Sequence, residues 1–63
     1  MITKDEFIAY EKVRQSGKTN MLDTKVVSAL SGLERRTIVE IIQSYSRLCK
    51  RYPDVRETNW NEV

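Results

Sequence analysis

Basic and polar side chains gather in the second half of the chain, in a pattern that could contact DNA. Between Leu33 and Tyr52 there are five basic residues and two acidic ones. A recognition helix usually presents its first turn to base edges in the major groove, and arginine suits this task because its planar fork of donors matches guanine. Basic residues elsewhere on such a unit contact phosphates. The predicted nucleic-acid-binding residues fall into two sets. Arg35, Arg36 and Thr37 are expected to face the bases, and the other predicted residues are Lys25, Gln43, Arg47 and Lys50.

The same basic face has a second interpretation, in which it is exposed to solvent or faces another protein. Exposed helices are commonly rich in charged and polar side chains. Glu40 lies within the basic stripe, where its carboxylate would repel phosphates. Both interpretations stay open at the level of the sequence.

Residues that could support catalysis or bind a metal ion are scarce. The chain has no histidine and a single cysteine, Cys49, whereas zinc sites combine several such ligands. Its acidic residues are scattered at predicted helix starts, where capping and the helix dipole account for them. We therefore expect no catalytic residue, no metal, no cofactor and no enzyme activity.

The tripeptide Gly17-Lys18-Thr19 matches the end of a phosphate-binding loop, but the rest of that motif is missing. The motif requires a glycine five positions before Gly17, where this chain has Lys12. It also requires a preceding strand, and this tripeptide follows a predicted helix. Nucleotide binding is therefore rejected.

The elements that carry these basic side chains have the spacing of a helix-turn-helix unit. The stretch from Thr24 to Tyr52 is interpreted as a short helix, a turn at Ser31-Gly32-Leu33 and a long helix that ends before a proline. Gly32 suits the turn because glycine adopts left-handed backbone angles at no steric cost and because the two backbones pass close together there. Ser31 and Glu34 have the spacing of a capping box at the start of the long helix.

The whole chain is predicted to be an all-α domain of three helices followed by an irregular tail. The evidence is a capping-box spacing at Thr3 and Glu6, a glycine stop at Gly17, and Pro53 after the last helix. Trp60 in the tail is expected to fold back onto the core. The expected helices cover residues 4–16, 21–31 and 33–52, with the three-helix domain at 1–53 and a flexible tail at 54–63.

Apolar residues recur at helical spacing and define a predicted core. In the second helix, Leu22, Val26 and Leu30 follow one another at steps of four. In the long helix, the apolar positions fall on one stripe roughly 120° wide, which is typical of a helix that faces a core. The predicted core consists of Phe7, Tyr10, Val13, Leu22, Val26, Leu30, Leu33, Ile38, Ile41, Ile42 and Tyr45.

Length and composition limit the classes of protein to which the chain can belong. Its 63 residues make one domain, with a net charge of +2 and 40% hydrophobic residues. A domain this small needs tight helix packing or a partner subunit, because burial barely offsets conformational entropy at this size. No apolar run approaches the roughly 20 residues of a membrane span. We therefore expect a cytoplasmic protein without a membrane partner.

One run of residues carries a resemblance to a known family. From Gly17 to Asp23 the chain reads Gly-Lys-Thr-Asn-Met-Leu-Asp, followed by Ser31-Gly32-Leu33 and an isoleucine-rich helix. Over roughly Phe7 to Tyr52, this pattern resembles a family of short phage and prophage proteins of unknown function from Gram-positive bacteria. The resemblance implies a small helical phage protein in the cytoplasm of the bacterial host, and it transfers no functional residues.

Two functions are compatible with these observations. The first is a DNA-binding regulator that contacts double-stranded DNA, as a homodimer that reads two half-sites. The second is a protein-binding module without DNA contact, such as an inhibitor of a host protein or a phage accessory factor. Salt dependence separates the two, because phosphate contacts weaken steeply as salt rises.

Overall fold

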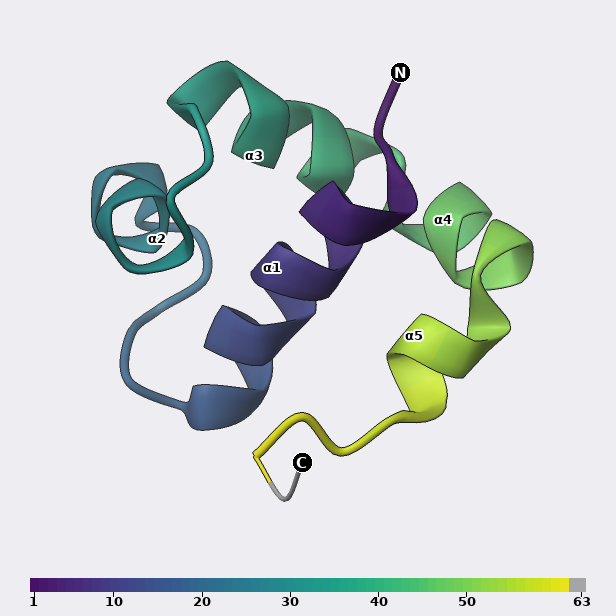
Figure 1. Ribbon diagram of the computed structural model, residues 1–63. Coiled ribbons are helices and arrows are strands. Elements are labelled where there is room, and N and C mark those ends of the chain that lie inside the picture. The colour runs from purple at the N-terminus through teal and green to yellow at the C-terminus, as the bar shows by residue number, and fades with distance from the viewer. Residues whose placement is uncertain (62–63) are drawn as a thin grey trace.

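Five helices make up the part of the chain that the structure describes, residues 1–61. Figure 1 shows the computed structural model. The all-α class predicted from the sequence is confirmed, and no strand occurs among the described residues. The helices are α1 (Lys4–Ser16), α2 (Thr24–Ser31), α3 (Arg35–Gln43), α4 (Tyr45–Arg51) and α5 (Pro53–Glu57).

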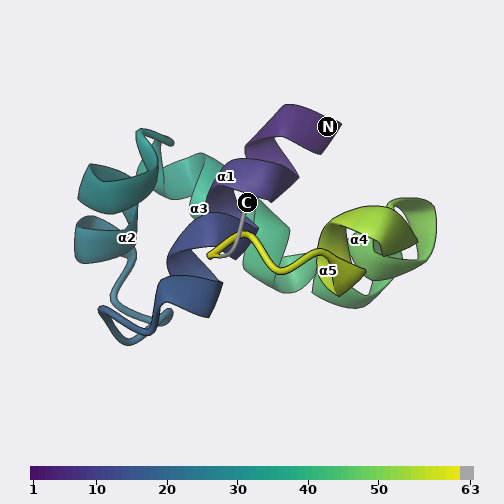
Figure 2. The same cartoon turned by 60° about the horizontal axis from the view of Figure 1, so that its bottom comes forward.

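The helices are arranged around α1. Helix α1 contacts α2, α3 and α5, while α3 also packs on α2 and α4 packs on α5. Helix α2 lies on one side of α1, whereas α4 and α5 lie on the other side, in both views (Figures 1 and 2). Helix α3 connects the two sides. The core is therefore formed where the other helices meet α1.

The first helix has the bounds that its capping signals predict. The backbone N–H of Thr3 donates to Glu6 Oε1 at 2.9 Å, and the N–H of Glu6 donates to Thr3 Oγ1 at 3.1 Å. These bonds satisfy two donors that a helix start otherwise leaves free. The helix ends at Gly17, whose φ of 66° is left-handed, a conformation that glycine adopts readily.

The second helix begins three residues later than predicted. Asp23 is its N-cap, and its Oδ1 accepts a hydrogen bond from the backbone N–H of Val26 at 3.4 Å. Upstream, Asn20 Oδ1 accepts from the N–H of Leu22 at 2.9 Å. Asparagine and aspartate make such local bonds in turns, so residues 21–23 form a turn and not a helical start.

The long helix predicted over 33–52 is divided into α3 and α4, so the three-helix prediction is wrong in its number of helices. The N–H of Ser44 is shared between the carbonyls of Glu40 and Ile41, at 3.0 and 3.2 Å. The interruption at Ser44 directs Tyr45 toward α1, where its ring lies 5.8 Å from Phe7 and 6.1 Å from Tyr10 between centroids. Aromatic packing of this kind is favourable at such distances.

The capping box predicted at Ser31 and Glu34 is also wrong. Ser31 is the last residue of α2, and its Oγ accepts from the N–H of Leu33 at 3.1 Å. Glu34 occupies the N-cap of α3 without a side-chain capping bond. Its carboxylate instead accepts from Arg36 Nε at 3.1 Å.

The predicted core is correct in α1 and α3 and wrong in α2. Leu22, Val26 and Leu30 are 74%, 38% and 49% exposed, whereas Val27 is fully buried. Helix α2 packs on both α1 and α3, and the side chain of Val27 faces the space between them. Leu33, Ile42 and Tyr45 are half-buried against the core. The buried apolar residues are Ile2, Phe7, Tyr10, Val13, Val27, Ile38, Ile41, Leu48 and Val55.

A short helix occupies the start of the predicted irregular tail. Pro53 is the first residue of α5, a position that suits proline because its fixed φ is helical and its missing N–H would be unpaired there. Val55 in this helix is only 1% exposed. Residues 53–57 therefore form a helix that packs on the core through Val55 and are not part of an irregular tail. Glu62 and Val63 lie outside the described residues.

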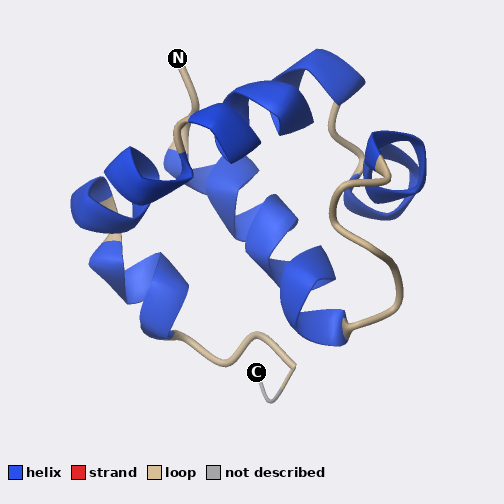
Figure 3. Cartoon of the chain, turned by 180° about the vertical axis from the view of Figure 1, so that it is seen from behind, coloured by secondary structure: helices blue, strands red, loops and turns tan. Residues whose placement is uncertain are grey.

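The segment after α5 returns to the C-terminal end of α1, as Figure 3 shows. The indole Nε1 of Trp60 donates to the carbonyl of Val55 at 3.1 Å, and its backbone N–H donates to Gln15 Oε1 at 2.7 Å. Gln15 Nε2 in turn donates to the carbonyl of Thr58 at 2.7 Å. The expectation that Trp60 folds back is confirmed, and Gln15 on α1 is the residue that holds this segment.

Glu11 is a fully buried charged side chain. Its carboxylate accepts from Arg14 Nε at 2.8 Å, from a second Arg14 nitrogen at 3.1 Å, and from the Tyr45 hydroxyl at 3.0 Å. A buried carboxylate requires such compensation, because desolvation penalises an unpaired charge. Burial, and then the hydrogen bond to Glu11, raise the pKa of Tyr45. This network joins α1 to α4.

Candidate nucleic-acid interface

The turn between α2 and α3 is held by three local hydrogen bonds. The N–H of Gly32 donates to the carbonyl of Ser28 at 2.9 Å, and the hydroxyl of Ser28 donates to the carbonyl of Leu33. The N–H of Leu33 completes the turn by donating to Ser31 Oγ. Gly32 has a left-handed φ of 77°. A Cβ added to it would meet nothing within 4 Å, so backbone conformation, and not close approach of the two helices, favours glycine here.

The start of α3 presents two arginines. Arg35 and Arg36 are exposed, and Thr37 is half-buried. Arg35 Nε lies 3.4 Å from Thr24 Oγ1, which brings the arginine to the first turn of α2, next to Lys25 in the sequence. Arg36 pairs with Glu34 at 3.1 Å, with the two side chains 87% and 74% exposed. An ion pair this exposed contributes little, and the hydrogen bond of Arg35 is long and exposed. Both arginines can therefore leave their contacts for a ligand.

Three other predicted contact residues come together at the junction of α3 and α4. Gln43, Arg47 and Lys50 line one hollow of about 310 Å³, together with Ser44 and Ser46. Neither Arg47 nor Lys50 forms a salt bridge within residues 1–61. Two free cations beside two hydroxyls are suited to a phosphate group.

The break at Ser44 changes how the basic residues are placed. The sequence interpretation puts Arg36, Gln43, Arg47 and Lys50 nearly in line on one continuous helix. In the structure, Arg47 and Lys50 belong to α4 and Arg36 to α3. The predicted contact residues therefore form two groups at opposite ends of α3, one at its first turn and one where it meets α4.

Arg51 belongs to the second group and was not among the predicted site residues. It lines a larger hollow of about 620 Å³ with Glu40, Arg47 and Lys50. Its guanidinium also lies 5.6 Å from the centre of the Tyr52 ring. The four-residue step from Arg47 to Arg51 is the sequence signal for it, because residues at that spacing share a helix face. Ser44 and Ser46 had no comparable signal before the helix break was known.

The acidic side chain in this region lies close to a positive group. Glu40 Oε2 lies 3.6 Å from the α-amino group of Met1, with the Glu40 side chain 49% exposed. The repulsion that Glu40 would exert on a phosphate is reduced by such a neighbour. It is nevertheless an exposed pair, so the reduction is modest and sensitive to salt.

Other kinds of site find little support in the described residues. No cluster of three or more histidine, cysteine, aspartate or glutamate side chains is placed to bind a metal ion in residues 1–61. Cys49 is half-buried against the core. In the same part of the chain, every helix is too short or too polar to cross a bilayer.

Comparison with protein-family models, with curated proteins and with solved structures finds no match to this chain.

Proposed function

We propose that this chain is a small phage-type helix-turn-helix-like DNA-binding regulator that acts in the cytoplasm of a bacterial host. Helix α3 is its recognition helix, with Arg35, Arg36 and Thr37 directed toward bases in the major groove. Lys25 and the residues of the α3–α4 hollow, Gln43, Arg47 and Lys50, contact the phosphate backbone. The observation that carries this proposal is the exposed Arg35 and Arg36 at the first turn of α3, directly after the α2–α3 turn.

The low net charge of the chain limits the affinity of one copy for DNA. A net charge of +2 gives one copy little electrostatic attraction for DNA. Two copies that read two half-sites gain useful affinity, because each copy adds its own contacts. We therefore include a homodimer in the proposed function.

Titration onto selected and random duplexes at two salt concentrations tests the proposal. Arg36→Ala should weaken binding to the selected duplex by about 1–3 kcal/mol and relax its sequence preference, because a base contact is lost. Lys50→Ala should weaken binding to both duplexes equally and reduce the salt slope by about one. Arg56→Ala is the matched control, since this exposed arginine lies on α5 and should leave binding nearly unchanged.

The DNA proposal fails if the protein binds neither duplex even at low salt, where its charges are least screened. It also fails if Arg36→Ala, Lys50→Ala and Arg56→Ala all change affinity by the same small amount. In either case the basic side chains are ordinary exposed residues.

A protein-binding module remains the second candidate, and exposed apolar side chains on α2 and in the turn before it favour it. Leu22 and Leu30 are 74% and 49% exposed, and apolar surface of this kind is common where another protein binds. Such an inhibitor or accessory factor would bind its partner through apolar contacts with little dependence on salt, in contrast to the steep dependence of phosphate contacts.

A further inference from the structure

Five large apolar side chains remain exposed among residues 1–61: Met1, Leu22, Val26, Leu30 and Val39. Two of them, Val26 and Leu30, lie on α2. Val26 and Leu30 are four residues apart on α2, so they lie about 40° from each other around the helix axis. Leu22 lies before α2, in the turn at residues 21–23. The two residues on the helix, Val26 and Leu30, are here called the α2 stripe; they lie to one side of the buried Val27, with Leu30 about 60° and Val26 about 100° from it around the helix axis.

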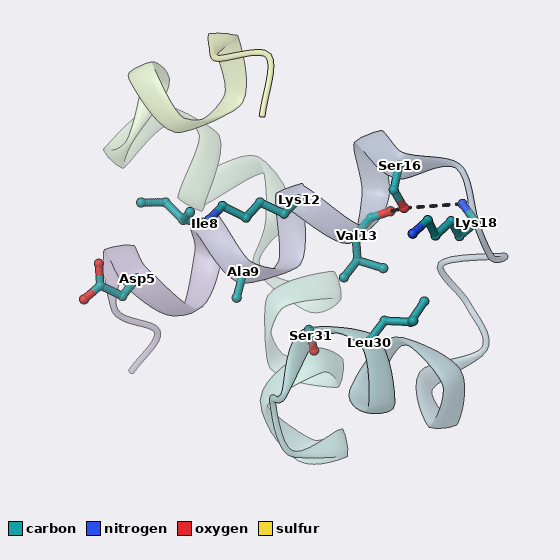
Figure 4. A pocket seen from close by; sticks show the side chains of 9 residues that line it. All are labelled: Asp5, Ile8, Ala9, Lys12, Val13, Ser16, Lys18, Leu30 and Ser31. Atoms are coloured by element: carbon teal, nitrogen blue, oxygen red, sulfur yellow. Dashed lines mark hydrogen bonds between the residues drawn. The ribbon is translucent and has the colours of Figure 1, made fainter. Parts of the chain in front are cut away.

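A groove between α1 and α2 adjoins this stripe (Figure 4). It has a volume of about 540 Å³, and its apolar lining comes from Ile8, Ala9 and Val13 of α1 and Leu30 of α2. Leu30 thus belongs both to the α2 stripe and to the wall of the groove. The groove is partly polar, since Lys12, Ser16 and Ser31 also line it. An exposed leucine beside it gives this face both a projecting side chain and a recess that can receive one.

Charges of opposite sign stand at the two ends of the groove. Figure 4 shows Asp5 at one end and Lys18 at the other. The position of Lys18 is fixed by Ser16, whose Oγ accepts from the Lys18 backbone N–H at 3.4 Å and donates to the carbonyl of Val13 at 2.6 Å. Neither Asp5 nor Lys18 forms a salt bridge within the described residues.

We infer that this face binds a second copy of the same chain. A twofold axis across the groove places the two copies antiparallel, so that Asp5 of each copy lies next to Lys18 of the other. The same axis lets Leu30 of each copy enter the groove of the other, between its α1 and α2. Such an isologous interface requires one surface that is complementary to itself. This face has both members of each contact, namely Asp5 with Lys18, and Leu30 with the groove that receives it.

The pairing uses a surface separate from the α3–α4 hollow. Helix α4 lies on the opposite side of α1 from α2 (Figure 2), so Arg47 and Lys50 stay exposed in the dimer. The inference therefore does not depend on DNA binding. It also gives a domain of 63 residues the additional apolar burial that chains of this size often obtain from a partner subunit.

Sedimentation measurements over a range of protein concentrations test the inference. The unmodified chain should show a reversible monomer–dimer equilibrium. Leu30→Gln should raise the dimer dissociation constant by roughly 10- to 100-fold, because an apolar contact is lost from each copy. Val39→Gln is the matched control, since Val39 is 41% exposed on α3, and it should leave the equilibrium unchanged.

A charge exchange distinguishes pairing of two copies from binding of a different protein. Asp5→Lys alone and Lys18→Asp alone should each weaken the dimer, and the double variant should restore it, because the two charges have exchanged places. Far-UV spectra recorded beside each measurement show that the variants remain helical. Helix α1 tolerates a change at Asp5 because Thr3 and Glu6 supply its cap.

Three results overturn the inference. They are a chain that stays monomeric up to about 1 mM, a dimer that Leu30→Gln and Val39→Gln weaken equally, and a double charge variant that does not recover. All three are measured without DNA, so none of them tests the contacts of one copy with DNA, although the first would remove the homodimer from the proposed function. Conversely, a dimer that binds no duplex would remove the proposed function and keep this interface.

Discussion

Helix α2 and the C-terminal segment from α4 to Trp60 differ in how their apolar residues are used. Helix α2 has a clear amphipathic pattern, yet only Val27 of its eight residues is buried. The C-terminal segment has no apolar periodicity after Tyr52, yet Val55 is 1% exposed and Trp60 is half-buried. Periodicity identifies a helix in the first case, but it selects the wrong face as the buried one.

The difference comes from what each segment contacts. The C-terminal segment is tied to α1 by Tyr45, which bonds Glu11, and by Trp60, which bonds Gln15. Between residues 1 and 61, no side-chain hydrogen bond joins α2 to α1, and its apolar contact with the core is centred on Val27. Burial along this chain therefore follows contacts with α1 more closely than local hydrophobicity.

The largest effect is expected where α1 meets α4. Arg14→Met leaves the fully buried carboxylate of Glu11 without its cation and with only the Tyr45 hydroxyl as a donor. Loss of one partner of a buried pair costs about 3–5 kcal/mol, which is most of the stability of a domain this size. Urea denaturation followed by circular dichroism would measure the change.

A double variant provides the control for that prediction. Replacing Glu11 and Arg14 together by methionine removes both charges, so the double variant should be more stable than Arg14→Met alone. If the two variants are equally unstable, the loss reflects packing and not the uncompensated carboxylate. Such a result would mean that contacts other than this network stabilise the packing of the C-terminal segment on α1.

Three valines allow the two regions to be compared with one kind of substitution. Val27→Ala on α2 and Val55→Ala on α5 should each lower the free energy of unfolding by about 2 kcal/mol, because both side chains are buried. Val26→Ala should change it by less than about 0.5 kcal/mol, since this side chain is 38% exposed and alanine favours helix.

Denaturant unfolding of these variants should use dilute protein, so that dimerisation does not contribute. A cost at Val26 equal to that at Val27 would mean that both faces of α2 are buried. A neutral effect at Val55 would mean that α5 adds nothing to the core. Either outcome would contradict the difference between the two regions.

The smallest effect is expected at the ion pair between α1 and α5. Lys4 Nζ lies 2.8 Å from Asp54 Oδ2. This hydrogen bond lowers the pKa of Asp54 and raises the pKa of Lys4. The lowered pKa gives stability that is present above about pH 4 and is lost as pH falls through the pKa of the folded Asp54. The raised pKa gives stability that is present below about pH 10 and is lost as pH rises through the pKa of the folded Lys4.

Comparison of the melting temperatures of the unmodified chain and Asp54→Asn across pH would detect this pair. The two curves should differ slightly between those limits and converge at both ends. The difference should shrink at high salt, because exposed charges are screened. A difference that persists at acid pH would show that Asp54 acts through something other than its charge.

The sequence by itself determined the class of the fold and the features that depend on neighbouring residues. Thr3 and Glu6 specify the start of α1, and Gly17 and Gly32 end two helices. The turn predicted at residues 31–33 is centred correctly on Gly32 but extends over residues 32–34, because Ser31 ends α2 and Glu34 is the N-cap of α3. These features are set within a few residues by hydrogen bonds and allowed backbone angles. For the same reason the exposed Arg35 and Arg36 could be placed at a helix start from the sequence.

Only the tertiary structure decided which faces are buried and where the long helix is interrupted. Val27 is buried in place of Leu30 because α2 must pack on α1 and α3 together. The break at Ser44 accompanies the contacts of Tyr45 with α1, which are distant in the sequence. Such long-range packing is absent from local periodicity. This long-range packing divides the predicted basic stripe into two groups and leaves the α2 stripe exposed.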